Sequence, residues 1–79
     1  MHWVYIIRSR KTGVYHVDST GSVNEKLEEH NLGKIRQTQY ATPWELVHKE
    51  AFDSWTDAVA MEKQIGSIGI GRYLRSIGK

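Results

Sequence analysis

The sequence contains no cysteine, which excludes disulfide bonds and any zinc site built from thiolates. Its four histidines, at positions 2, 16, 30 and 48, do not have the spacing of a metal finger either. No long apolar run is present: the segment Trp3–Ile7 is too short for a signal peptide or a membrane span. These absences predict a soluble, cytoplasmic protein that has no membrane partner.

The chain is also short and weakly charged. Its 79 residues are fewer than two domains usually need, so we expect a single domain over residues 1–79. Three Trp and four Tyr provide large side chains for its small core. Eleven Lys and Arg against nine Asp and Glu give a net charge of only +2, which alone is weak support for a nucleic-acid partner. The composition leaves the oligomeric state open.

The distribution of charge is more informative than its sum. Residues 1–17 and residues 63–79 contain basic residues and no acid, whereas acids gather after the first of these segments, at Asp18, Glu25, Glu28 and Glu29. Two basic segments of this kind allow one side of the molecule to face phosphate groups. An ordinary solvated surface also explains them, and both interpretations stay open at this point.

A β-hairpin is predicted at the N-terminus. Trp3–Arg8 and Val14–Ser19 are rich in β-branched and aromatic residues, and residues 9–13 between them are typical of a turn. Polar residues 34–42 further along the chain have no apolar periodicity, which favours a loop.

The first helix is predicted over residues 23–31. Ser22 and Glu25 have the spacing of a capping box, in which the Ser side chain caps an amide and the Glu side chain reaches back. Gly33 suits the end of this helix.

The second half of the chain adds a strand and two helices. Trp44–Phe52 is predicted as the third strand, and a second helix is predicted from a cap at Ser54 to Ile65, before Gly66. The glycine-rich tail favours only a short final helix, over residues 72–77. The order strand, strand, helix, strand, helix, helix predicts an α+β fold, with a small three-stranded antiparallel sheet flanked by helices.

Glu62 is the candidate site residue that the periodicity itself indicates. On a helical wheel it lies inside the apolar arc that includes Ala58 and Ile65. An ionised carboxylate on that side is costly unless it is paired or binds a metal, so its position calls for a partner. The alternative is a boundary residue that bends to solvent or pairs with Lys or Arg.

Four further residues are candidates for chemistry. Lys26 and His30 are four residues apart and share one helix face, where a cation and an imidazole suit phosphodiester chemistry. Tyr5 and His16 lie on the two arms of the hairpin and meet if the strand register sets them opposite or diagonal. The alternatives are a surface pair between Lys26 and an acid, a half-buried His30, a core Tyr5 and a surface His16.

Several segments in sequence order resemble the GIY-YIG nuclease superfamily, and the likeness covers nearly the whole chain. It is strongest to small bacterial proteins similar to the N-terminal domain of the excision-repair nuclease UvrC, which implies a setting in DNA repair. Each segment alone is a weak signal, but their order and spacing are specific. The segments are WVYIIRS at residue 3, YHVDST at residue 15, LEEHN at residue 27 with Gly33-Lys34 after it, TPWELV at residue 42, and Ala58 with MEKQI at residue 61.

The resemblance implies metal-dependent hydrolysis of DNA phosphodiester bonds, with Mg²⁺ or Mn²⁺ and without a small-molecule cofactor. It makes Tyr5 the first motif tyrosine, which helps to position or deprotonate the attacking water. Glu62 becomes the single metal ligand, and His30 matches a helix histidine that assists in the site. The basic residues expected to face DNA are Arg8, Lys34, Arg36, Lys63 and Arg72.

Three positions depart from the family pattern. His16 falls on the second motif tyrosine, Asp18 on the motif glycine and Lys26 on a catalytic arginine. Lys lacks the planar fork that grips two phosphate oxygens, and Asp adds a negative charge where backbone approaches phosphate. We therefore expect a nuclease fold with impaired hydrolysis. The alternatives are an active endonuclease in which His16 and Lys26 substitute, and a non-catalytic module that binds nucleic acid or protein on the same scaffold.

Overall fold

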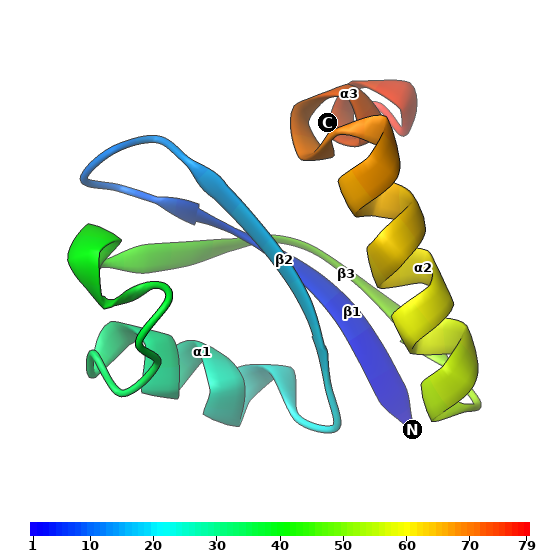
Figure 1. Ribbon diagram of the computed structural model, residues 1–79, viewed down its shortest axis with the longest axis horizontal. Coiled ribbons are helices and arrows are strands. Elements are labelled where there is room, and N and C mark those ends of the chain that lie inside the picture. The colour runs from blue at the N-terminus through cyan, green and yellow to red at the C-terminus, as the bar shows by residue number, and fades with distance from the viewer.

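The computed structural model describes residues 1–79 and contains one antiparallel sheet with helices on both faces (Figure 1). The predicted α+β order of strand, strand, helix, strand, helix, helix is confirmed. In chain order the elements are β1 (His2–Ser9), β2 (Tyr15–Thr20), α1 (Val23–Asn31), the 3-10 turn η1 (Gln39–Ala41), β3 (Trp44–Phe52), α2 (Trp55–Ile68) and α3 (Ile70–Ser76).

β1 is the central strand, because the sheet order is β2-β1-β3. In the hairpin, Tyr5 pairs with Asp18 and Ile7 pairs with His16. Side chains of directly paired residues lie on the same face of a sheet. Tyr5, Asp18 and His16 therefore share one face, with His16 diagonal to Tyr5, as the hairpin prediction required.

Alternate residues of β1 enter two separate cores. Tyr5 and Ile7 pack with Val23 of α1, whereas Val4 and Ile6 pack against the other helices. All four of these β1 residues are at most 1% exposed. Figure 1 shows the same division, with α1 on one side of the sheet and α2 on the other. The residues of α2 and α3 in the second core are Ala58, Ile65, Tyr73 and Leu74.

The predicted caps of α1 are present, with one difference. The Ser22 hydroxyl accepts the Glu25 N–H at 3.4 Å. The reaching-back half of the capping box is absent, because the Ser22 N–H instead donates to Thr20 Oγ1 at 3.1 Å. At the other end, Gly33 has a φ of 73°. The N–H of Gly33 bonds to the carbonyl of His30, and the next N–H bonds to the carbonyl of residue 29, which is the Schellman arrangement.

The predicted end of α2 at Ile65 is wrong. The helix continues through Gly66 to Ile68 and ends where Gly69 takes a φ of 103°. Gly66 has no positive φ, and the burial of Ile65 against the sheet holds the helix beyond it. Packing of this kind overrides the low helix propensity of a single glycine.

α3 also begins earlier than the predicted residues 72–77, at Ile70. Its Tyr73 and Leu74 are buried in the second core. None of the helices has the length and apolar character that crossing a membrane requires.

Two glycine substitutions should change stability in opposite directions. We expect Gly33→Ala to lower the free energy of unfolding by about 1–2 kcal/mol, because an L residue is strained at positive φ. Gly66→Ala is the matched control: it adds a methyl inside α2 where no atom lies within 4 Å, and should raise stability by about 0.5–1 kcal/mol. Urea unfolding followed by circular dichroism measures both. Equal effects of the two changes would contradict the assignment of Gly33 as the helix stop.

Candidate active site

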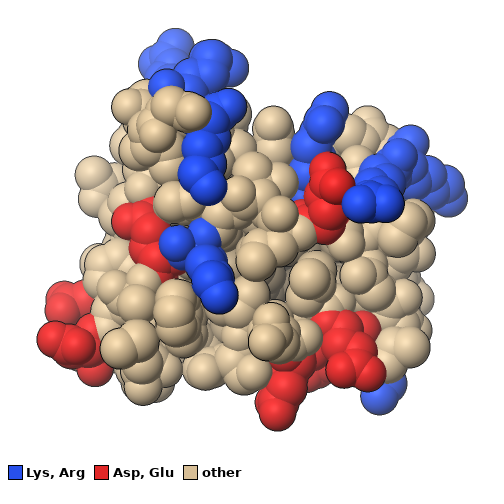
Figure 2. All heavy atoms as spheres, turned by 180° about the vertical axis from the view of Figure 1, so that it is seen from behind, with Lys and Arg blue, Asp and Glu red and all other residues tan.

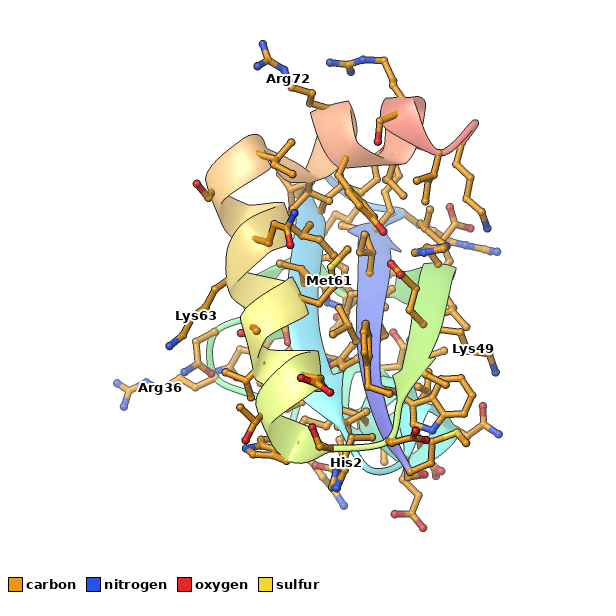
Figure 3. The ribbon with its side chains drawn as sticks, turned by 90° about the vertical axis from the view of Figure 1, so that its right-hand side faces the viewer. His2, Arg36, Lys49, Met61, Lys63 and Arg72 are labelled. Atoms are coloured by element: carbon orange, nitrogen blue, oxygen red, sulfur yellow. The ribbon has the colours of Figure 1, made fainter.

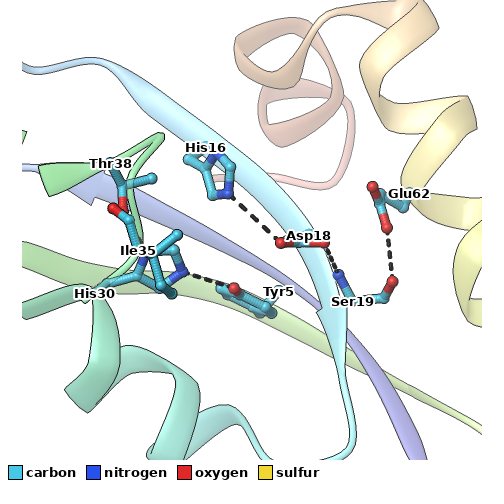
Figure 4. Close-up of polar contacts among 8 residues, drawn as sticks. All are labelled: Tyr5, His16, Asp18, Ser19, His30, Ile35, Thr38 and Glu62. Atoms are coloured by element: carbon cyan, nitrogen blue, oxygen red, sulfur yellow. Dashed lines mark hydrogen bonds and ion pairs between the residues drawn. The ribbon is translucent and has the colours of Figure 1, made fainter. Parts of the chain in front are cut away.

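A buried hydrogen bond between Tyr5 and His30 lies at the centre of the candidate site. Tyr5 projects from β1 and His30 from the last turn of α1, and the Tyr5 hydroxyl lies 2.7 Å from His30 Nε2 (Figure 4). Both residues are 0% exposed, so His30 is more deeply buried than a half-buried helix residue. The fold thus brings two of the predicted catalytic residues into direct contact.

The other ring nitrogen of His30 contacts Thr38, which the sequence did not indicate. His30 Nδ1 lies 2.7 Å from Thr38 Oγ1, and Thr38 is itself 1% exposed. The Trp44 indole N–H donates to the Thr38 carbonyl at 3.0 Å. Thr38 stands in the polar stretch that was predicted only as a loop. A single polar residue in such a stretch carries no periodic signal that could have revealed its position.

Both members of the Tyr5–His30 pair are neutral near pH 7. The pKa of His30 is lowered to about 4, chiefly by burial, with the nearby charges of His16 and Lys26 acting in the same direction. Burial also raises the pKa of the Tyr5 hydroxyl, with the negative charges of Asp18 and Glu62 acting in the same direction. The phenol therefore keeps its proton, and the imidazole carries only one.

His16 packs against His30. Its ring centroid lies 5.4 Å from that of His30 in an edge-to-face arrangement, and 6.2 Å from that of Trp44. His16 Nε2 has no hydrogen-bond partner, and Asp18 Oδ2 lies 3.8 Å away. Its side chain is 28% exposed, so the alternative of an ordinary surface histidine does not describe it.

Asp18 is the charged group on the open side of the site. It is directly opposite Tyr5 in the hairpin, and its Oδ1 accepts the N–H of Ser19 at 2.8 Å. The pKa of its carboxyl lies below the usual value, chiefly because of the neighbouring His16, and also because of the Ser19 N–H and the charge of Lys26. Its side chain is 38% exposed. Asp18 is therefore an ionised carboxylate beside the buried phenol.

Lys26 lies close enough to this cluster to influence it. Its charge contributes to the lowered pKa of both His30 and Asp18. The side chain is partly buried and forms no ion pair or hydrogen bond. The alternative of a surface pair with Glu25 or Glu29 is therefore not seen, and the amino group is free to meet an anion.

Glu62 approaches from the opposite face of the sheet. Its Oε1 accepts the Ser19 hydroxyl at 2.6 Å, so the partner that its position called for is a neutral side chain and no cation. Ser19 follows Asp18 in the edge strand β2, and consecutive side chains point to opposite faces. Figure 4 shows Asp18 between the Tyr5–His30 pair and the Ser19–Glu62 pair. The two halves of the candidate site meet only at the β2 edge.

The carboxylates of this region suit a metal site that is completed by water. They do not suit one in which protein side chains supply most of the ligands. No group of three or more His, Asp or Glu side chains is placed to hold a metal ion. Glu62 is partly exposed, and the serine hydroxyl leaves its negative charge without a compensating cation. Mg²⁺ keeps several waters and needs only one or two protein carboxylates. Glu62 therefore fits such an ion.

The predicted DNA-facing residues do not form one patch. Arg36 and Lys63 project from the same side of the molecule, beyond the β2 edge, whereas Arg72 lies at the α3 end (Figure 3). Lys49 extends from the opposite side. Seen from behind, most Lys and Arg side chains occupy the upper half and several acids line the lower edge (Figure 2). The predicted set is thus divided among separate parts of the surface.

Arg8 and Lys34 are both exposed: Arg8 lies near the end of β1, and Lys34 lies shortly after α1. The Arg8 Nε donates to the Gly13 carbonyl at 3.3 Å, and its guanidinium lies 5.8 Å from the centre of the Tyr15 ring. Arg8 is therefore turned back along the hairpin. Lys34 follows the C-terminal end of α1.

The one pocket of the surface lies away from this cluster. It has a volume of about 210 Å³. None of the residues predicted to be catalytic lines it, so the candidate site is an open sheet edge and no cleft. The lining residues are Trp3, Gly21, Ser22, Val23, Asn24 and Lys49.

Comparison with known proteins gives a consistent set of matches. A family model described as the GIY-YIG catalytic domain matches residues 1–67. A UPF0213 protein of Halobacterium salinarum is 38% identical over 66 residues, which are 82% of this chain and 84% of that protein. A UPF0213 protein of Natronomonas pharaonis is 35% identical over 77 residues, 96% of this chain and 89% of that protein.

A bacterial relative shows the same coverage. A UPF0213 protein of Staphylococcus haemolyticus is 30% identical over 77 residues, 96% of this chain and 93% of its own length. No solved structure matches the chain.

The low pKa of His30 should make stability depend on pH. The folded protein holds this pKa at about 4, whereas the unfolded chain has the ordinary value of 6.5, so between these values the unfolded chain binds more protons. The contribution of His30 is complete above about pH 6.5 and is lost as the pH falls toward 4, by up to about 1.4 kcal/mol per pH unit.

Urea unfolding between about pH 7 and pH 5 measures this slope, and His30→Gln should reduce it. An NMR titration of the imidazoles provides the direct check. A midpoint near the ordinary histidine value for His30 would refute the burial of a neutral ring.

Proposed function

The chain belongs to the GIY-YIG family, and from that membership we propose that it is a DNA-binding protein of nuclease descent whose metal-dependent phosphodiester hydrolysis is impaired. GIY-YIG is a family of nucleases, so a DNA phosphodiester is the substrate class to consider. The observation that carries the proposal is the complete burial of the Tyr5–His30 pair beside the ionised Asp18.

The first reason for impairment is access. A group that accepts a proton from attacking water must lie within hydrogen-bond reach of that water. The Tyr5 hydroxyl is 0% exposed and its hydrogen-bond partner is His30. A water molecule therefore reaches the phenol only if the side chains that bury it move. The resting arrangement therefore keeps Tyr5 from the reaction.

The second reason is charge. A phosphate at the β2 edge meets Asp18 on the same face as Tyr5. Two unit negative charges about 4 Å apart repel by about 4 kcal/mol at an effective dielectric constant near 20. Lys26 offsets part of this repulsion, but its single ammonium group cannot grip two phosphate oxygens as an arginine does. Transition-state stabilisation should fall accordingly.

Glu62 retains the property that metal binding needs. When bound, a divalent ion such as Mg²⁺ or Mn²⁺ would stabilise the negative charge that develops on the phosphate. Glu62 would hold the ion, after exchanging its contact with the Ser19 hydroxyl. We expect weak metal binding, because one carboxylate supplies few of the ligands that either ion takes.

An active endonuclease is the second candidate. One observation favours it: His16 Nε2 is buried and has no hydrogen bond, so this ring nitrogen could transfer a proton, where the family has a tyrosine, once the ring turns toward solvent. If His16 takes this role, the burial of Tyr5 does not prevent cleavage. Binding of nucleic acid or protein without any cleavage is the remaining alternative.

A plasmid-nicking assay with and without Mg²⁺ or Mn²⁺ separates these functions. We expect the wild-type protein to cleave near the background rate, and Glu62→Ala to leave that rate unchanged. Glu28→Ala, which removes an exposed carboxylate of α1, is the matched control. Clear cleavage that is lost in Glu62→Ala and kept in Glu28→Ala would contradict the proposal of impaired hydrolysis. It would show that the protein is an active endonuclease.

Restoring the family residues should raise cleavage. We expect His16→Tyr, Asp18→Gly and Lys26→Arg together to increase the nicking rate at least about tenfold, because they return the second motif tyrosine, remove a repelling charge and supply a guanidinium that grips two phosphate oxygens. Asp18→Asn alone isolates the charge effect, and Asp53→Asn at an exposed position is its control. No gain from the triple change would show that these positions do not explain the defect.

Binding of DNA should weaken as the salt concentration rises, and it should depend on basic residues on one side of the molecule. Arg36→Ala and Lys63→Ala should each weaken binding to duplex DNA and reduce the slope of log K against log salt by about 1. Lys49→Ala is the control, because Lys49 projects from the opposite side (Figure 3). Fluorescence anisotropy over a salt series gives these slopes. Absence of DNA binding at low salt would contradict both the proposal of a nuclease and the proposal of a DNA-binding protein that does not cleave.

A further inference from the structure

Three buried side chains form a continuous hydrogen-bonded chain behind the candidate site. The Tyr5 hydroxyl contacts His30 Nε2, and His30 Nδ1 contacts Thr38 Oγ1, both at 2.7 Å. Each of these residues is at most 1% exposed, so the groups must satisfy one another. A fourth group ends the chain: the Ile35 carbonyl lies 3.4 Å from Thr38 Oγ1.

The number of protons limits how this chain can be arranged. A neutral imidazole carries one proton, and each hydroxyl carries one, so three protons need acceptors. If His30 is protonated at Nδ1, Tyr5 donates to Nε2, Nδ1 donates to Thr38, and Thr38 donates to the carbonyl. Every proton then has an acceptor.

The opposite arrangement fails at Tyr5. If His30 is protonated at Nε2, this nitrogen donates to the Tyr5 oxygen and Thr38 donates to Nδ1. The Tyr5 proton then has no acceptor, because the hydroxyl contacts no other polar group and is shielded from water. A buried donor without a partner is costly, which favours protonation at Nδ1.

Thr38 is held in place independently of the ring. Its N–H donates to the Ile35 carbonyl at 3.1 Å, and its own carbonyl accepts the Trp44 indole N–H at 3.0 Å. The Thr38 hydroxyl is therefore fixed by the turn before β3 and not by His30. A fixed acceptor at Nδ1 can select one tautomer of a neighbouring histidine.

We propose that Thr38 is a positioning residue that keeps His30 in the tautomer protonated at Nδ1, so that Nε2 is the acceptor for the Tyr5 proton. In this arrangement Tyr5 keeps its proton and donates it to His30 Nε2 in a hydrogen bond. Thr38 then still accepts from Nδ1. The importance of this orientation for the candidate site rests on the proposed function, but the tautomer itself does not.

NMR of the ring nitrogens tests the proposal in the free protein, without DNA or metal. In the wild type near pH 7 we expect one His30 species, with a protonated Nδ1 and an unprotonated Nε2. Failure of the nuclease proposal would leave this spectrum unchanged, so the two outcomes are distinguishable. A His30 ring protonated at Nε2 would overturn the tautomer assignment, whatever any variant does.

Two Thr38 variants test whether this residue makes the selection. Thr38→Ser keeps the hydroxyl and should keep the single tautomer. Thr38→Val has the same shape without the hydroxyl, so either tautomer leaves one buried proton without an acceptor, and we expect the two tautomers to mix. Amide spectra confirm that each variant is folded. A Thr38→Val protein with the same single tautomer as the wild type would show that Thr38 does not select it.

Discussion

Burial of β1 on both faces is the constraint on which the rest of the structure depends. Because successive side chains of the strand enter different cores, neither face is left for solvent, and the hydroxyl of Tyr5 must find its partner inside the protein. His30 provides that partner, which fixes α1 against the sheet. Thr38 and Trp44 extend the same network to the start of β3, so one buried polar chain joins three segments of the sequence.

The alternation of strand side chains also divides the chemistry. Asp18 and Ser19 are neighbours in β2, yet one faces the Tyr5–His30 pair and the other holds Glu62. A substrate that contacts both Asp18 and Glu62 must therefore reach around the edge strand β2. Without a side chain at position 18 this edge would be open to a phosphate. Asp18 places a negative charge there, and we propose that this charge disfavours the approach of a phosphate while the fold is preserved.

Sequence reasoning succeeded where local patterns decide the structure. The order of strands and helices along the chain, the Gly33 helix stop and the core-facing position of Glu62 all follow from periodicity or from backbone requirements over a few residues. It failed where distant contacts decide. α2 passes Gly66 because Ile65 is buried against the sheet, and Thr38 matters because folding brings it to a ring eight residues away. No periodic pattern encodes such contacts.

The central claim is that the buried Tyr5 does not take part in hydrolysis in the resting structure. Single-turnover cleavage of a short DNA duplex in Mg²⁺ or Mn²⁺, compared between the wild type and Tyr5→Phe, tests it most directly. The structure predicts the same rate for both, close to the rate without protein, because the phenol is buried and hydrogen-bonded to His30. Cleavage by the wild type that Tyr5→Phe abolishes would contradict it.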